Sequence, residues 1–389
     1  MANASQHAVY FVPEATNGTT PTSALTWSRL RAIGCTLGLT KGKMMSKELK
    51  VNRIQSDTRI GTRQASGEIP CEGLFDAPVK AALEATLGDT WTAPATAAAK
   101  TTISATVSTF AFSGNDSPVV VPGDLILVTG FASSTNNGVF QVLSRTAAAI
   151  TVTSAYTLVV AAAGPAIVVQ PMAVLKSGVT RRTFSFLRYF ADLAAGSKPY
   201  HVYRGCEFKS VQVTIKPEEI VSMNFGILAR DGLIQSGLPT GCTLGAASSV
   251  KPMDAFAGAV IEGDALGVQT QNGICIEANF TFDNGTAPKY VIGSDTSIQF
   301  SQGVANLQGS IKLWFENTTH MDNFLNETET AFIIAVNDPA GNYYAFEFPR
   351  VLLTDGQAPV SGDGPLTIDV PLAMQEHATY GSHIRVWKS

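Results

Sequence analysis

Two long segments of alternating side chains, joined by a short turn, place the tightest limit on the fold. In residues 180–193 (TRRTFSFLRYFADL), Phe184, Phe186 and Phe190 share one side, and 199–219 (PYHVYRGCEFKSVQVTIKPEE) alternates again after AAGSKP. Alternate positions share one face of a strand, so the pattern predicts a long β-hairpin. Both faces carry mixed side chains, and an isolated hairpin is marginal in water. The hairpin must therefore belong to a sheet that neighbouring strands continue.

Most of the remaining chain is also typical of strands. Residues 28–45 read as extended, and the final third contains strand-like runs such as ICIEANFTF and NYYAFEFPRVLL, with a hairpin turn at 338–341 (DPAG). Residues 231–273 are rich in Gly, Ala and Ser, and we expect a loop there. The fold class predicted is mainly β, a β-sandwich or barrel with one or two short helices.

The clearest helix follows Asp76, a good N-cap residue, and has Pro78 in its first turn. Apolar residues recur at helical spacing after it, and Gly88 ends the pattern. A second short helix is predicted near HMDNFLNE, residues 320–327.

Composition changes sharply at residue 89. Only six charged residues occur in 89–176, which begins with the linker-like TWTAPATAAAKTT and continues as short strands with turns, including Asn136-Asn137-Gly138. We expect a small all-β domain at 89–176, inserted into a host domain formed by 1–88 and 177–389.

Charge is scarce and unevenly distributed. Charged residues make up 15% of the chain and the net charge is −4, with an excess of +7 in residues 1–252 and −11 in 253–389. A chain with few charges often buries surface in an assembly, and a subunit polarised in this way could associate head to tail. The alternative is that the two surfaces differ by chance.

The segment 46–69 (SKELKVNRIQSDTRIGTRQASGEI) departs from this background, with eight charged residues in a polar ribbon that has no helical stripe. It continues a basic run that starts at Lys41. A solvated loop is one interpretation, and a contact surface for an acidic partner is the other. Aromatic residues do not interleave with the basic ones, so base recognition in nucleic acid is not supported.

No constellation for catalysis, cofactor binding or metal binding emerges. GLTKGKM (38–44) has the wrong glycine spacing for a P-loop, and Met44 stands where a magnesium-binding hydroxyl is needed. The five histidines lack metal-ligand spacing, and the five dispersed cysteines suit reduced thiols in a reducing cytoplasm. We expect no signal peptide and no transmembrane helix. The sequence therefore predicts a protein that is not an enzyme.

Three motifs in this order resemble the tail tube proteins (major tail proteins) of long-tailed, non-contractile bacteriophages. They are SKELKVNRIQSDTRIGTRQASGEI before a short helix, the hairpin FSFLRYF…YHVYRGCEFKSVQVTI, and NDPAGNYYAFEFPRVLL before a terminal strand pair. The resemblance covers about 1–88 and 177–389, and the segment 89–176 departs from it.

The resemblance implies a virion protein that assembles with itself. Six copies would form a ring and the rings would stack into a tube through which DNA leaves the capsid without specific binding. Tape measure, tail terminator and tip proteins would be partners, and no membrane would be involved. The protein would be made in the host bacterial cytoplasm and reside in the virion tail.

The resemblance also places a ring-to-ring contact loop at 40–68. Its candidate contact residues are Lys41, Lys43, Lys47, Lys50, Arg53, Asp57, Arg59 and Arg63. Acidic side chains lining the tube would repel phosphate and keep DNA mobile. The candidates on or next to the long hairpin are Asp192, Glu207, Glu218 and Glu219.

A second interpretation keeps the β-rich fold but changes the role. The chain could be a tail-tip or adhesion module that binds host glycans through the inserted domain. Copy number separates the two, since tube subunits are numerous in each virion and tip proteins are few.

Overall fold

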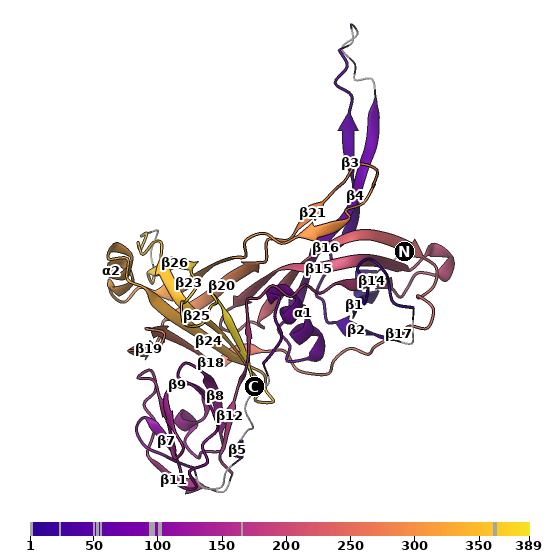
Figure 1. Ribbon diagram of the computed structural model, residues 1–389. Coiled ribbons are helices and arrows are strands. Elements are labelled where there is room, and N and C mark those ends of the chain that lie inside the picture. The colour runs from indigo at the N-terminus through magenta and orange to yellow at the C-terminus, as the bar shows by residue number, and fades with distance from the viewer. Residues whose placement is uncertain are drawn as a thin grey trace.

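The computed structural model describes residues 3–22, 25–49, 51, 54, 57–92, 98–99, 103–164, 166–360 and 364–389. It is mainly β with two short α-helices, which confirms the predicted fold class (Figure 1). Three short 3-10 turns lie at Ala4–Gln6, Ser134–Asn136 and Ala195–Ser197.

The elements fall into three groups along the chain. The first comprises β1 (His7–Pro13), β2 (Thr26–Leu30), β3 (Gly38–Met45), β4 (Thr58–Glu72) and α1 (Ala77–Leu87). The second comprises β5 (Ala98–Ala99), β6 (Ile103–Ala105), β7 (Thr109–Phe112), β8 (Leu125–Thr129), β9 (Gly138–Thr146), β10 (Ala149–Val152), β11 (Ala161–Gly164) and β12 (Val168–Pro171). The third comprises β13 (Ala173–Lys176), β14 (Phe184–Phe190), β15 (Tyr200–Ile215), β16 (Ser222–Gln235), β17 (Thr243–Leu244), β18 (Asp254–Gly263), β19 (Gln269–Gln271), β20 (Cys275–Asp283), β21 (Ala287–Lys289), β22 (Gln299–Ser301), β23 (Asn306–Trp314), α2 (Thr319–Leu325), β24 (Thr330–Asn337), β25 (Tyr343–Leu353), β26 (Thr367–Met374) and β27 (Arg385–Lys388).

The predicted long hairpin is confirmed as β14 and β15, which pair antiparallel from Phe184 opposite Cys206 to Tyr189 opposite Tyr200. Neighbouring strands continue it on every side, because β1 pairs with β14, β16 pairs along β15, and β20 pairs with the C-terminal part of β15. These strands belong to one 17-stranded sheet. A strand as long as β15 is thus stabilised by three different partners.

Helix α1 forms where the sequence predicts it. The Asp76 carboxylate accepts a hydrogen bond from the Val79 amide at 3.0 Å, and Gly88 ends the helix in the left-handed conformation. Val79, Ala82 and Leu83 are buried and pack into the main hydrophobic core. The second predicted helix is also confirmed as α2, and the DPAG turn joins β24 to β25.

Strands β5 to β12 form a separate eight-stranded sheet, which lies at one side of the molecule in Figure 1. The Asn136-Asn137-Gly138 turn joins β8 to β9, as predicted. The hydrophobic core of this sheet extends into the main sheet through Ile261, Ile333, Ala335, Ala345 and Trp387. Its base is therefore packed firmly against the main sheet.

The expectation of a loop across 231–273 is confirmed for most of 236–253 but is wrong at both ends of the range. Strand β16 continues to Gln235, and β18 pairs antiparallel with β24 from Ala259 to Gly263 after an irregularity in the register. Strand β18 is mostly half-buried or exposed, so its side chains show little alternation. Pairing with a buried strand decides its structure where local composition favours a loop.

Candidate assembly surfaces

The described part of the polar ribbon belongs to a β-hairpin that projects from the body of the molecule and that also includes β3, just before the ribbon (Figure 1). Strands β3 and β4 pair antiparallel from Gly38 opposite Ser66 to Met45 opposite Thr58, with a register shift between Lys41 and Lys43. We call the projecting part of this hairpin, residues 39–64, the arm. The sequence allowed a solvated loop here, but β3 pairs with β4 within one chain.

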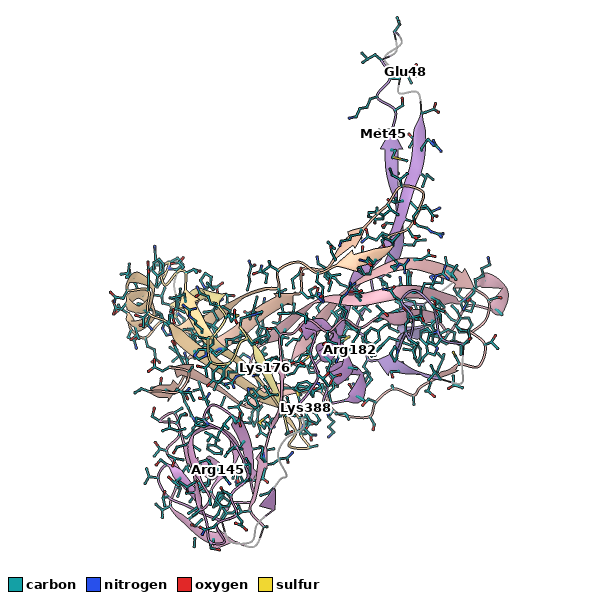
Figure 2. The ribbon with its side chains drawn as sticks, viewed as in Figure 1. Met45, Glu48, Arg145, Lys176, Arg182 and Lys388 are labelled. Carbon is teal, nitrogen blue, oxygen red and sulfur yellow. The ribbon has the colours of Figure 1, made fainter. Side chains whose placement is uncertain are left out.

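The arm also exposes large apolar side chains to solvent. From Leu39 to Met45 the strand β3 is exposed, and Met44, Met45 and Ile60 on the arm are each more than half exposed. Figure 2 places Met45 and Glu48 near the end of the arm. Large apolar side chains held in water on a projecting hairpin are typical of a surface that a partner covers.

Basic and apolar side chains share one face of the arm. Lys41 and Lys43 lie two residues apart on β3, on the same face as Leu39 and Met45. Lys41 stands directly opposite Arg63 on β4, a like-charge pair that destabilises an isolated hairpin. The face is thus suited to a partner with acidic and apolar side chains.

The root of the arm is anchored by an ion-pair network. Asp231 is 6% exposed and accepts from Arg204 at 2.7 Å, and its other carboxylate oxygen lies 3.3 Å from Nε of Arg63. Arg63 also pairs with Asp295 at 3.3 Å, and Tyr290 donates its hydroxyl to Gln64 at 2.7 Å. Arg63, which the sequence assigns to a ring-to-ring contact, is already engaged within the chain.

The other predicted contact residues lie farther out. Lys41, Lys43, Lys47, Asp57 and Arg59 are exposed. Lys50 and Arg53 lie outside the described residues.

Three of the four candidate tube-lining acids lie at two distant places. Asp192 follows β14 and accepts from the Asn3 amide, whereas Glu218 and Glu219 are exposed in the turn after β15. Strand β15 has 16 residues, which at about 3.3 Å per residue separates its ends by about 50 Å. The acids therefore mark two ends of one long strand.

Glu207 does not offer a free charge. It is 4% exposed and accepts a hydrogen bond from Arg181. Burial raises the pKa of the Glu207 carboxyl, and the Arg181 guanidinium opposes that rise. Alternation along β15 was a poor guide here, because Arg181, which precedes β14 in the chain, lies against this carboxylate.

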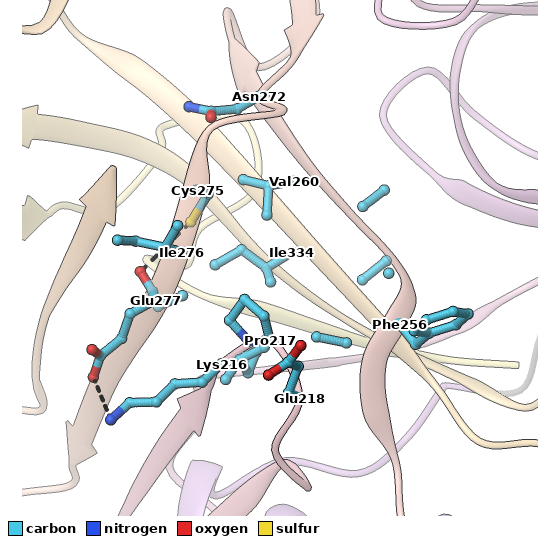
Figure 3. A pocket seen from close by; sticks show the side chains of 16 residues that line it. Lys216, Pro217, Glu218, Phe256, Val260, Asn272, Cys275, Ile276, Glu277 and Ile334 are labelled. Carbon is cyan, nitrogen blue, oxygen red and sulfur yellow. Dashed lines mark hydrogen bonds and ion pairs between the residues drawn. The ribbon is translucent and has the colours of Figure 1, made fainter. Parts of the chain in front are cut away.

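A mostly apolar pocket of about 320 Å³ lies between the end of β15, β18, β20 and β24 (Figure 3). Lys216 forms an ion pair with Glu277 at 3.3 Å beside it, and Phe256 at its edge is 98% exposed. Burial raises the pKa of the Cys275 thiol in its lining to about 11. That thiol is protonated at neutral pH and is a weak nucleophile.

A family model described as phage tail tube protein matches residues 4–374. The chain belongs to this family. A search of curated proteins finds no relative. As a tail tube protein, the chain is a structural component of the bacteriophage virion, located in the tail.

Two further observations concern the described part of the chain. None of its helices is long and apolar enough to cross a membrane, and its His, Cys, Asp and Glu side chains form no group of three or more that could hold a metal ion. The P-loop-like GLTKGKM forms strand β3 rather than a loop before a helix.

Sequence reasoning missed the apolar content of the tail tube arm. Met44, Met45, Leu49, Val51, Ile54 and Ile60 were all visible in the sequence, but interleaved charges concealed them. A search for apolar side chains inside polar runs would have found this signal.

Proposed function

We propose that this tail tube protein forms the tube of a long-tailed, non-contractile phage. The resemblance implies six copies in each ring. We propose rings built from six tube-forming members, which stack so that DNA leaves through the lumen. The arm carries this proposal, because it presents exposed basic and apolar side chains well outside the body of its own chain.

In this proposal the arm joins one ring to the next. Its basic face, with Lys41 and Lys43, meets the acidic C-terminal part of a chain in the neighbouring ring. Exposed acids there include Glu316, Asp322 and Glu327, at and around α2. Such a contact joins two different surfaces, and a chain of these contacts propagates as a filament.

We further propose that exposed acids keep the lumen from gripping DNA. Asp192, Glu218 and Glu219 remain candidates, and their positions at the two ends of β15 would distribute negative charge along the height of a ring. Glu207 is no longer included, because its carboxylate is buried against Arg181.

The domain boundaries enter the same proposal. Residues 1–88 and 177–389 form the tail tube part, and 89–176 forms an inserted domain that decorates the tube. The eight-stranded sheet of β5 to β12 supports this division. Tape measure, terminator and tip proteins are proposed partners, and synthesis takes place in the host cytoplasm.

Negative-stain microscopy of the purified chain tests the proposal. We expect stacked rings with a central channel, and immunolabelling of phage particles should mark the tail along its length. Monomers alone under assembly conditions, together with label confined to the tail tip, would contradict the proposal and favour the tip module.

A further inference from the structure

The main sheet contains the same strand arrangement twice. In the N-terminal unit, made of β1–β4, α1 and β14–β16, neighbouring strands follow the order β2-β1-β14-β15-β16-β4-β3. In the C-terminal unit, made of β18–β20, β23, α2 and β24–β26, the order is β19-β18-β24-β25-β26-β23-β20. When the seven strands of each unit are numbered along the chain, both units have the same spatial order of strands, 2-1-5-6-7-4-3. Every pairing is antiparallel, and each unit has its helix between the fourth and fifth strands.

Two glycines mark equivalent points in the two units. A Cβ on Gly67 of β4 would lie 2.4 Å from the Leu37 backbone, and a Cβ on Gly309 of β23 would lie 2.7 Å from the Asn279 carbonyl. In each case the fourth strand crosses close to the chain of the third, where a side chain does not fit.

The residues around these glycines match as well. The second and fourth residues after each glycine are buried, namely Ile69 and Cys71 in one unit and Ile311 and Leu313 in the other. The helix N-cap follows nine residues after each glycine, at Asp76 and at Thr318. Agreement in strand order, burial and helix position indicates an internal duplication.

The two units meet edge to edge inside one chain. Strand β20, the third strand of the C-terminal unit, pairs with β15, the sixth strand of the N-terminal unit, from Ser210 opposite Asp283 to Ile215 opposite Ala278. The connection between β20 and β23 then contacts the root of the arm, where the Arg63 amide donates to the Asp295 carbonyl at 2.7 Å. One unit-to-unit junction is therefore visible in full.

The corresponding edge of the N-terminal unit is open. Strand β3 is the counterpart of β20, and in the described residues β4 is its only strand partner. The Thr36 amide donates to the Glu68 carbonyl on β4. Because the backbone groups of successive residues point to opposite sides of a strand, those of Leu37 and Leu39 point away from β4. The Leu37 carbonyl accepts from Arg188 and Tyr203, which leaves the edge open from Leu39 onward. An unpaired strand edge readily adds a strand from another chain.

We propose that each chain supplies two members of the ring, and that the open edge of β3 takes the C-terminal unit of a second copy of this chain. The contact between chains uses the backbone edge of β3, the counterpart of β20 in the junction within the chain, and leaves the Lys41 and Lys43 side chains for the neighbouring ring. This inference rests on the proposed ring. Because each chain supplies two of the six members, three chains close one ring. The sheet of β5 to β12 follows α1 only, whereas α2 leads directly to β24, so a ring displays three inserted sheets.

Cryo-electron microscopy of tubes from the unmodified chain tests this count. We expect threefold rings with three peripheral densities, and isolated rings with three times the 41.0 kDa chain mass. Sixfold rings with six such densities would overturn the inference and leave the proposed tube function intact. Failure to form rings would overturn both.

A substitution tests the β3 edge. Leu39→Pro removes the outward amide from the open edge, whereas the matched Leu39→Ala keeps it. We expect the ring peak in size-exclusion chromatography to be lost for Leu39→Pro and retained for Leu39→Ala, with monomer unfolding measured for both. If Leu39→Pro forms rings in the same yield as the wild type, the β3 edge is not part of the contact between chains. If Leu39→Pro does not fold, the symmetry of the unmodified ring still decides the proposal.

Discussion

The arm and the inserted sheet project from different sides of the molecule, but they are attached in opposite ways (Figures 1 and 2). The inserted sheet buries its base, where Trp387 is 1% exposed and donates to Glu347 at 2.6 Å. Gln141 from the inserted sheet donates to the same buried Glu347 at 3.4 Å, and Arg385 also bonds to it. Beyond its root, most of the described side chains of the arm are exposed to solvent.

This difference separates stability from assembly. A region that buries its contacts within the chain is expected to contribute to folding, whereas exposed contacts contribute once a partner arrives. Substitutions at the base of the inserted sheet should therefore change unfolding, and substitutions on the outer arm should change association.

The largest stability effect is expected at the base of the inserted sheet. Trp387→Ala removes a buried indole and its hydrogen bond to Glu347, and should lower the free energy of unfolding by about 3–5 kcal/mol. Met45→Ala on the arm, where the side chain is 63% exposed, should change it by less than about 0.5 kcal/mol. Urea denaturation of both variants provides the comparison, and equal effects would remove the distinction between the two regions.

An intermediate effect is expected at the root of the arm. Asp231→Ala leaves Arg204 and Arg63 without their shared carboxylate and should cost about 1–3 kcal/mol. Asp295→Ala is the matched control, because that carboxylate is 71% exposed and should contribute less than about 1 kcal/mol. Thermal unfolding measures the loss of stability in the two variants. A larger loss for Asp295→Ala than for Asp231→Ala would show that Asp231 does not anchor the arm.

The smallest effect is a dependence on pH at His7, the first residue of β1. Burial, followed by Arg188 and His201, lowers the pKa of His7 from 6.5 to about 4, and Arg188 donates to the His7 ring at 3.2 Å. Below pH 6.5 the unfolded chain binds a proton at His7 more readily than the folded chain does. The stabilising contribution is therefore complete above pH 6.5 and is lost as pH falls towards 4.

His7→Gln keeps a hydrogen-bond acceptor for Arg188 but does not titrate. Its thermal midpoint should fall less steeply than that of the wild type between pH 6.5 and 4. Parallel pH profiles for the two proteins would show that His7 is not responsible.

Local signals in the sequence predicted the local structure well. Asp76 and Gly88 bounded α1, the alternation from Phe184 predicted the β14–β15 hairpin, and the DPAG turn was visible directly. Each depends on residues close together in the chain, where capping, periodicity and turn chemistry act.

Long-range structure was harder to predict. The duplication is not visible in the sequence, because the segments around Gly67 and Gly309 have little sequence in common. The two glycines are recognised as equivalent from the pairing of their strands. The burial of Glu207 and the engagement of Arg63 depend on Arg181 and Asp231, which are distant in the sequence. Such contacts exist only once the sheet is assembled.

Tube length in assembled samples tests the central claim, that the arm joins rings into a tube. Lys41→Glu combined with Lys43→Glu reverses the charge of the exposed face beyond Leu39, and the exposed Lys251→Glu is the control. In negative stain, the double variant should give isolated rings or short stacks, and the control should give wild-type tubes. Tubes of wild-type length from the double variant would contradict this role for the arm.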